Sequence, residues 1–225
     1  VDKLVTSSFE LSDFKNVYDN LSANSQIATL FHYESQATPN NKIVLSKDRN
    51  FDSAQVKVGI IGAGNFCKNI VVPLLKSLDY QVNAIASRSG ISATEIAKML
   101  NANIATTDYK EILNDPSINL IMITTRHSLH SDMVVEALKA GKHVFVEKPL
   151  AISIKQLKEV IDVYNHCQGQ ILCVGFNRRF APTTRRLKER LASLSGPVAI
   201  NCRVNAGKIP ESSWIYDPVE GGGRV

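Results

Sequence analysis

Lys148 is the residue of this sequence best placed to do chemistry. It lies in the stretch AGKHVFVEKP, residues 140–149, in which His143 to Val146 form a short run typical of an inner strand. Glu147 and Lys148 follow that run, and Pro149 restricts the backbone after them. Ligands of open parallel α/β sheets bind beyond the carboxyl ends of the strands. Lys148 is therefore a candidate acid/base group, and the ordinary alternative is a solvated lysine that pairs with Glu147.

The elements that must position this lysine alternate between strand and helix patterns over residues 55–175. Apolar strand-like runs lie at 56–61, 82–87, 104–106, 120–124, 143–146 and 171–174, with helical patterns between them. Continuous apolar strands that alternate with helices are typical of a parallel sheet covered on both faces. Right-handed crossovers then predict an α/β fold with a doubly wound parallel sheet of the Rossmann type. We expect Ser92 and Glu95 to form a capping box at the start of the helical segment over 92–100.

A glycine-rich loop, Gly62-Ala63-Gly64-Asn65-Phe66-Cys67, joins the first strand to its helix. In this setting Gly62 permits a tight turn and Gly64 lets the backbone approach a pyrophosphate at the helix N-terminus. Cys67 replaces the third glycine of the pattern and is small enough for close packing. We therefore predict that Gly62, Gly64, Asn65 and Phe66 contact a dinucleotide; the alternative is an ordinary tight turn.

The second strand ends in Ser87-Arg88-Ser89, with no carboxylate of the kind that binds the ribose 2′-hydroxyl of NAD. These side chains suit a 2′-phosphate, so the sequence favours NADP over NAD. The alternative for Arg88 is a solvated surface residue.

The fourth strand ends in Thr124-Thr125, with His127 and His130 close behind, again at a carboxyl end. We expect these four residues to face the nicotinamide ribose or the substrate, together with Glu147 and Lys148. Helix capping is the alternative for each histidine. Burial and the cationic nicotinamide ring would both lower the pKa of Lys148 toward a useful acid/base range.

Basic residues gather after the sixth strand. Asn177, Arg178 and Arg179 are placed to bind a substrate carboxylate or phosphate. We expect the helix over 183–194 to bury Leu187, Leu191 and Leu194 and to solvate its charges, and residues 197–205 to form a long strand.

Composition restricts the remaining function classes. The 225 residues are 44% hydrophobic and 21% charged, which is typical of a globular protein. The net charge of +5 fits an anionic cofactor or substrate and does not require nucleic acid. No apolar run reaches the ~20 residues of a membrane span, and we expect no signal peptide, because the first residues are already polar. The four cysteines lack C-x-x-C spacing, so we expect reduced thiols, no metal site and a cytoplasmic protein.

Several motifs together resemble the glucose–fructose oxidoreductase / inositol dehydrogenase / MocA (Gfo/Idh/MocA) family. They are VGIIGAGNF at 58–66, DYKEIL at 108–113, HSDM at 130–133, AGKHVFVEKPL at 140–150 and GFNRRFAP at 175–182. The resemblance implies a Rossmann domain, an α+β substrate domain after it, and oxidation or reduction of sugars or cyclitols with NAD or NADP. It places the family's catalytic lysine on Lys148. The family's second common catalytic residue, a histidine, has no counterpart here, because no histidine follows His166.

The two ends of the chain resemble a more specific group of proteins. Residues 1–35 are similar to the tail of a zinc-type medium-chain alcohol dehydrogenase, and 36–54 have the composition of a linker. Residues 205–210 and the run WIYDPVEGGGR at 214–224 are similar to oxidoreductases that fuse both families, which are associated with bacterial surface polysaccharide synthesis. The similarity implies that Trp214 contacts substrate. It also predicts that 55–175 is the Rossmann domain and that 176–225 is the truncated start of a substrate domain, within an internal piece of a longer protein.

The sequence thus predicts a nicotinamide-dependent oxidoreductase that acts on a hydroxyl of a sugar or nucleotide-sugar and forms a homo-oligomer when complete. The alternative is a non-catalytic nucleotide-binding regulatory module. Nucleic-acid binding through residues 178–190 is a third possibility, which the lack of interleaved aromatic residues disfavours.

Overall fold

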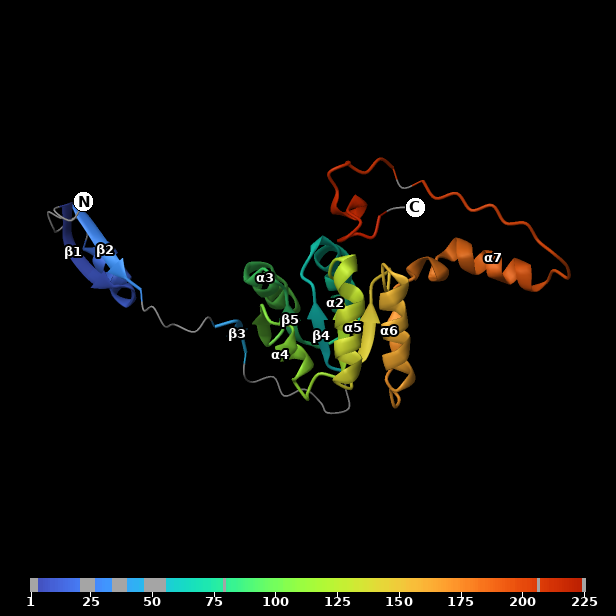
Figure 1. Cartoon of the computed structure of the whole chain (residues 1–225), viewed down its shortest axis with the longest axis horizontal. Coiled ribbons are helices and arrows are strands. Elements are labelled where there is room, and N and C mark those ends of the chain that lie inside the picture. The colour runs from blue at the N-terminus through green and yellow to red at the C-terminus, as the bar shows by residue number, and fades with distance from the viewer. Residues whose placement is uncertain are drawn as a thin grey trace. The chain divides into compact units, whose positions relative to one another are not determined.

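The computed structural model describes residues 4–20, 27–33, 40–46, 56–78, 80–205 and 207–223. Two compact units make up the chain, Val1–Asn40 and Asn41–Val225. In the first unit, strands β1 (Val5–Glu10) and β2 (Ala28–His32) pair in parallel, and η2 (Leu11–Asp13) and α1 (Phe14–Asp19) follow β1. The second unit contains a large sheet flanked by helices, drawn from light blue at β3 through yellow in Figure 1.

This sheet confirms the doubly wound Rossmann prediction. Its strand order is β3-β6-β5-β4-β7-β8-β9, so the chain winds outward from β4 to one edge and then returns to build the other half. The strands are β3 (Lys42–Val44), β4 (Val58–Ile61), β5 (Val82–Ala86), β6 (Ile104–Thr106), β7 (Leu120–Ile123), β8 (His143–Val146) and β9 (Leu172–Val174). Strands β4 to β9 are parallel, as the apolar runs predict, and β3 alone pairs antiparallel.

Helices cover both faces of the sheet (Figure 1). One face packs against the continuous helix made of η4 (Cys67–Val71, a π-helical turn) and α2 (Val72–Ser77), and against α3 (Gly90–Leu100). The other face packs against α4 (Lys110–Leu113), α5 (His130–Lys139) and α6 (Ile154–Asn165). Each strand residue faces one side or the other in alternation, which is why both faces of an inner strand must be apolar.

Strand β4 shows how tight this packing is. All four of its residues are buried, with Ile60 facing the α2–α3 side and Ile61 the α4–α5 side. A Cβ on Gly59 would lie 2.4 Å from Cγ2 of Ile112 in α4. The glycine in this strand therefore sets how closely α4 approaches the sheet.

Two local predictions in this unit are wrong. Helix α3 begins at Gly90 and is capped by Ser89, whose hydroxyl accepts the Ser92 N–H at 3.4 Å, whereas the sequence placed the cap at Ser92. The supposed capping-box partner Glu95 pairs instead with Lys68 at 2.5 Å. Within the predicted linker 36–54, residues 42–44 form β3, because the edge of β6 offers unpaired backbone groups to the passing chain.

The C-terminal predictions also need correction. Residues 197–205 form no strand, since no described strand lies beside them to supply hydrogen bonds. Helix α7 (Pro182–Ala192) buries none of its residues, so the predicted apolar face at Leu187 and Leu191 is not covered here. Two short turns, η6 (Asn177–Phe180) and η7 (Trp214–Tyr216), flank this part of the chain.

Among the described residues, no helix is both long and apolar enough to cross a bilayer.

The four cysteines are unpaired, and three of them lie outside the apolar core. Cys67 is the exception: it is fully buried, and this burial raises the pKa of its thiol to about 11. It therefore takes the packing role expected of the third position in the glycine-rich loop.

Gly59→Ala should destabilise the fold, because the added methyl overlaps Ile112. We expect a loss of about 1–3 kcal/mol in the free energy of unfolding, measured by urea denaturation. Ile112→Ala removes the obstructing methyl group, so the double variant should lose less than the sum of the two single variants. Strict additivity would contradict the packing described for β4 and α4.

Candidate active site

The carboxyl ends of β4 and β7 meet at the centre of the sheet, where the strand order reverses. Gly62 follows β4 with a φ of 110°, and a Cβ there would lie 2.7 Å from the backbone carbon of Thr124. Thr124 donates its backbone N–H to Ile61 O at 2.8 Å and its hydroxyl to Gly62 O at 2.7 Å. Conformation and close approach both require glycine at this crossing.

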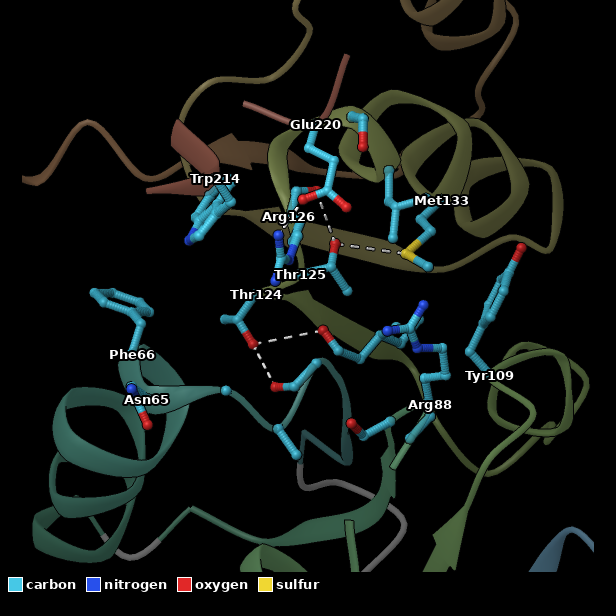
Figure 2. Close-up of a pocket in the computed structure, with 18 of the residues that line it drawn as sticks. Asn65, Phe66, Arg88, Tyr109, Thr124, Thr125, Arg126, Met133, Trp214 and Glu220 are labelled. Carbon is cyan, nitrogen blue, oxygen red and sulfur yellow. Dashed lines mark hydrogen bonds and ion pairs between the residues drawn. The ribbon is translucent and has the colours of Figure 1, made fainter. Parts of the chain in front are cut away.

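A cavity of about 760 Å³ opens at this crossing, a volume typical of small-molecule sites (Figure 2). We call it the switch-point pocket. The loop Gly62–Gly64 and the helix start at Asn65 and Phe66 line it. A Cβ on Gly64 would meet no atom within 4 Å, so ligand atoms can approach this backbone closely. A glycine loop that opens onto a helix N-terminus suits a pyrophosphate.

Ser87 and Arg88 line the same pocket after β5, with Tyr109 nearby (Figure 2). Arg88 is exposed, so its guanidinium is available to a ligand. Among the described residues that line this pocket, Glu220 is the one carboxylate, and it is paired with Arg126. At the β5 end, the described lining of the pocket therefore offers the exposed guanidinium of Arg88 and no unpaired carboxylate. This arrangement suits a ribose 2′-phosphate.

A second cavity, of about 490 Å³, adjoins the first and shares Phe66, Thr124, Thr125 and Trp214 with it. We call it the lysine pocket, because Glu147 and Lys148 line it from the end of β8. His127 lines it from η5 (His127–Leu129), after β7, and its Nδ1 lies 2.8 Å from the carbonyl oxygen of Gly221. The two cavities thus place the predicted acid/base residue beside the predicted dinucleotide site.

Burial shifts the pKa values of two groups near Lys148, Glu147 and His127. It raises the pKa of Glu147, and the Lys148 backbone N–H, which donates to Oε2 at 3.3 Å, partly opposes this rise. The positive charge of Lys148 also lowers that pKa. Burial lowers the pKa of His127, and the carbonyl of Gly221 acts against that shift. His127 is therefore biased toward the neutral form, with its Nδ1–H donated to Gly221.

Space for the Glu147 side chain comes from a glycine that the sequence reasoning did not single out. A Cβ on Gly175, just after β9, would lie 2.7 Å from Oε1 of Glu147. Gly175 also donates its N–H to Val146 O at 2.8 Å. The lack of a side chain at Gly175, at the end of β9, thus leaves the space that the Glu147 carboxylate occupies. The available sequence signals were the glycine at the end of an apolar run and its place at the start of the GFNRRFAP motif.

His130 has a different setting from His127. It is fully buried, with Nδ1 at 2.7 Å from Pro149 O and Nε2 at 3.1 Å from Thr125 O. Its ring therefore bridges the chain ends that follow β7 and β8. This contact holds the segment that carries Lys148 against the segment that carries Thr125.

The structure does not bring every predicted site residue together. Ser89 caps α3 and lines neither cavity. Asn177, Arg178 and Arg179 lie in the exposed turn η6 and also line neither cavity, and the Arg179 guanidinium lies over the ring of Phe180 at 5.0 Å. These arginines were predicted as ligand-binding residues because they lie in a basic run after β9. The composition of that run does not indicate the direction of the chain after the strand.

Trp214 does reach the site, and it brings neighbours that the sequence reasoning missed. Arg126 lies over the Trp214 ring at 5.1 Å and pairs with Glu220 (Figure 2). The rings of Trp214 and His127 meet edge to face, with 4.7 Å between their centroids. Ser128 N–H donates to Glu220 O at 3.0 Å. The segment after η7 is thus held over the loop that follows β7.

Tyr109 was also missed as a pocket residue. Its hydroxyl donates to Oε2 of Glu136 in α5 at 3.0 Å. Burial, followed by this hydrogen bond, raises the pKa of Tyr109 to about 12. The ring therefore stays neutral and is fixed between the loop after β6 and α5. Its place in the DYKEIL motif was the available signal.

The chain is similar to known oxidoreductases in sequence and in fold. Residues 56–176 match the family described as "Oxidoreductase family, NAD-binding Rossmann fold" (Gfo/Idh/MocA), which is more than half of the chain. The chain belongs to this family. An inositol 2-dehydrogenase/D-chiro-inositol 3-dehydrogenase of Lactiplantibacillus plantarum is 34% identical over 140 residues, which cover 60% of this chain and 39% of that protein. A D-xylose 1-dehydrogenase (NADP(+)) of Haloferax volcanii is 32% identical over 169 residues, which cover 74% of this chain and 52% of that protein.

Two solved structures of oxidoreductases are similar to this chain in fold. The 3-ketoreductase KijD10 from Actinomadura kijaniata, in complex with TDP-benzene and NADP, is similar with a TM-score of 0.56 and 26% identity, over 61% of this chain and 43% of that one. Myo-inositol dehydrogenase from Lactobacillus casei, in complex with NAD(H) and myo-inositol, has a TM-score of 0.58 and 29% identity, over 62% and 42%. The chain spans about half or less of the length of these relatives.

The glycine loop provides a matched pair of variants. Gly62→Ala should destabilise the fold, because its positive φ and the Thr124 backbone leave no place for a Cβ. Gly64→Ala should leave the midpoint of thermal unfolding unchanged, since nothing lies within 4 Å, but should weaken NADPH binding about tenfold or more by blocking the approach of a pyrophosphate. Thermal denaturation and fluorescence titration measure the two effects. Equal NADPH affinity of Gly64→Ala and the unaltered protein would remove the loop from the cofactor site.

Proposed function

We propose that this chain is the cofactor-binding part of an NADP(H)- or NAD(H)-dependent dehydrogenase that acts on a hydroxyl of a sugar or nucleotide-sugar. The observation that carries the proposal is the junction of the two cavities at Thr124 and Trp214, with Lys148 lining the second one. Membership of the Gfo/Idh/MocA family and similarity to proteins named as inositol, xylose and keto-sugar enzymes support it.

The residues of the switch-point pocket fit a dinucleotide. Gly62 and Gly64 leave the loop backbone open to a pyrophosphate, and Arg88 offers a cation at the β5 end. A bound nicotinamide would donate or accept the hydride at the substrate carbon. Because the cavities meet at Phe66, Thr124 and Trp214, the nicotinamide end of an extended cofactor would lie toward the lysine pocket.

In this arrangement Lys148 would polarise the substrate oxygen and exchange its proton at Nζ. Lys148 is exposed, so its ammonium can reach a substrate, while Glu147 beside it is half-buried. Glu147 would hold the Lys148 backbone through the hydrogen bond to its N–H. His130 would keep this segment in register with Thr125. We assign His127, Trp214 and Arg126 to the wall that orients the substrate and excludes water.

The ends of the chain extend the proposal. Because residues 1–35 resemble the tail of a zinc-type alcohol dehydrogenase, we propose that the complete protein fuses such an enzyme to a Gfo/Idh/MocA oxidoreductase. In this proposal 55–175 is the Rossmann domain and 176–225 is the start of the substrate domain. That pairing suggests a role in surface polysaccharide synthesis. We also propose a cytoplasmic homo-oligomer for the complete protein.

Arg88→Ala should weaken NADPH binding about tenfold or more and change NADH binding little, because only NADPH carries the 2′-phosphate. Isothermal titration with both cofactors measures this. Arg186→Ala, an exposed arginine on α7, is the control and should change neither affinity. A proportionate loss for both cofactors after Arg88→Ala would remove the basis for preferring NADP.

Lys148→Ala should lower kcat at least about 100-fold while cofactor affinity changes little, since the lysine moves a proton and contributes little to dinucleotide binding. The assay follows NAD(P)H absorbance with a panel of sugars and nucleotide-sugars, using the full-length protein encoded by the gene. Lys155→Ala, whose side chain is 89% exposed on α6, is the control. Unchanged turnover of Lys148→Ala would overturn its role. Tight cofactor binding by the unaltered protein, without turnover of any substrate, would instead favour a regulatory module.

A further inference from the structure

Strand β3 comes from outside the α/β repeat, yet it lies beside the end of β6 that reaches the switch-point pocket. Its register pairs Lys42 with Thr106, Ile43 with Ala105 and Val44 with Ile104. Thr107 donates its N–H to Asn41 O at 2.9 Å, and Leu45 donates its N–H to Asn103 O at 2.7 Å. The strand therefore holds β6 from its first residue to the pocket end.

The pocket end of β6 in turn holds the segment after β5. Ser87 N–H donates to Thr106 O at 3.1 Å. Thr107 lines the pocket, and a Cβ on Gly90 would lie 3.4 Å from its Cγ2, so Thr107 faces the first turn of α3. These contacts flank Arg88 on both sides along the chain. A displacement of Thr106 and Thr107 would displace the backbone on which Arg88 stands.

The loop after β6 also has hydrogen bonds among its own residues. Asp108 N–H donates to Thr106 Oγ1 at 3.0 Å, and Lys110 N–H donates to the Asp108 carboxylate at 2.9 Å. These bonds shape the turn, and the hydrogen bond from the Tyr109 hydroxyl to Glu136 ties it to α5 on one face of the sheet. On the open edge of β6, the bond from Thr107 to Asn41 holds the backbone of Thr107.

We infer that β3 is a positioning element of the cofactor site, which sets the place of Ser87 and Arg88 through Thr106 and Thr107. The described residues 41–46 do not line the switch-point pocket, so the strand acts through its backbone bonds to β6. The ligand group concerned is the phosphorylated ribose of the adenosine half. This inference rests on the proposed dinucleotide site and assigns a second part of the chain to it.

The antiparallel pattern gives a matched pair of substitutions. Hydrogen-bonded and non-hydrogen-bonded pairs alternate along such a ladder. Because pairs 41/107 and 45/103 are hydrogen-bonded, the N–H of Ile43 faces β6 and the N–H of Val44 faces outward. The two residues are similarly exposed, at 50% and 48%, so the two substitutions differ chiefly in the direction of the N–H that proline removes. Proline is tolerated on an edge strand only where the N–H faces away from the sheet.

Ile43→Pro should raise the dissociation constants of NADPH and 2′,5′-ADP about tenfold and that of NADH less, whereas Val44→Pro should match the unaltered protein. Titration calorimetry on the full chain measures all three ligands. A purely structural role would lower the midpoint of thermal unfolding without changing the ratio of NADPH to NADH affinity. Equal NADPH/NADH ratios in the two variants would overturn the inference.

Hydrogen–deuterium exchange on the unaltered protein tests the same coupling without a variant, in case Ile43→Pro does not fold. Coupling is reciprocal, so saturation with 2′,5′-ADP should slow amide exchange at Ile43 and Leu45. Bound 2′,5′-ADP with unchanged exchange at both amides would overturn the inference while leaving the proposed function standing. Failure to bind any dinucleotide or 2′,5′-ADP would overturn both.

Discussion

The crossing of Gly62 against Thr124 is the contact on which the site depends. Here the first strand of each half of the sheet ends, and the two chains approach so closely that a side chain on Gly62 would overlap the Thr124 backbone. The Thr124 hydroxyl and N–H tie the two strand ends together. Both cavities open from this point, because the chain leaves Gly62 toward one face and Thr124 toward the other.

The lysine pocket shows how backbone contacts prepare a charged site. The buried His130 ring lies between the carbonyl oxygens of Thr125 and Pro149, with a ring nitrogen within hydrogen-bond distance of each, so the segments after β7 and β8 are held together. Gly175 leaves room for the Glu147 carboxylate. Burial then shifts the pKa of Glu147 upward and that of His127 downward, which favours the neutral form of both groups around Lys148.

Prediction from sequence succeeded where the signal was local and repeated. The strand over 104–106 and the strand over 143–146 were predicted to the residue, because apolar runs between turn residues leave few alternatives. The glycine loop was placed correctly between a strand and a helix. The cap of α3 was misplaced by three residues, because Ser89 and Ser92 are equally suitable by type and only the backbone conformation at Ser89 separates them.

The sequence by itself determined the doubly wound fold, the glycine-rich loop between the first strand and its helix, and the strand-end position of Lys148, since periodicity and residue type encode these within short windows. Only the tertiary structure decided which distant residues join the site. Trp214 and Glu220 reach Arg126 across more than eighty positions of sequence, and β3 bonds to β6 although its residues read as linker. Such contacts depend on the path of the chain and on unpaired backbone groups at a sheet edge, which residue types alone do not specify.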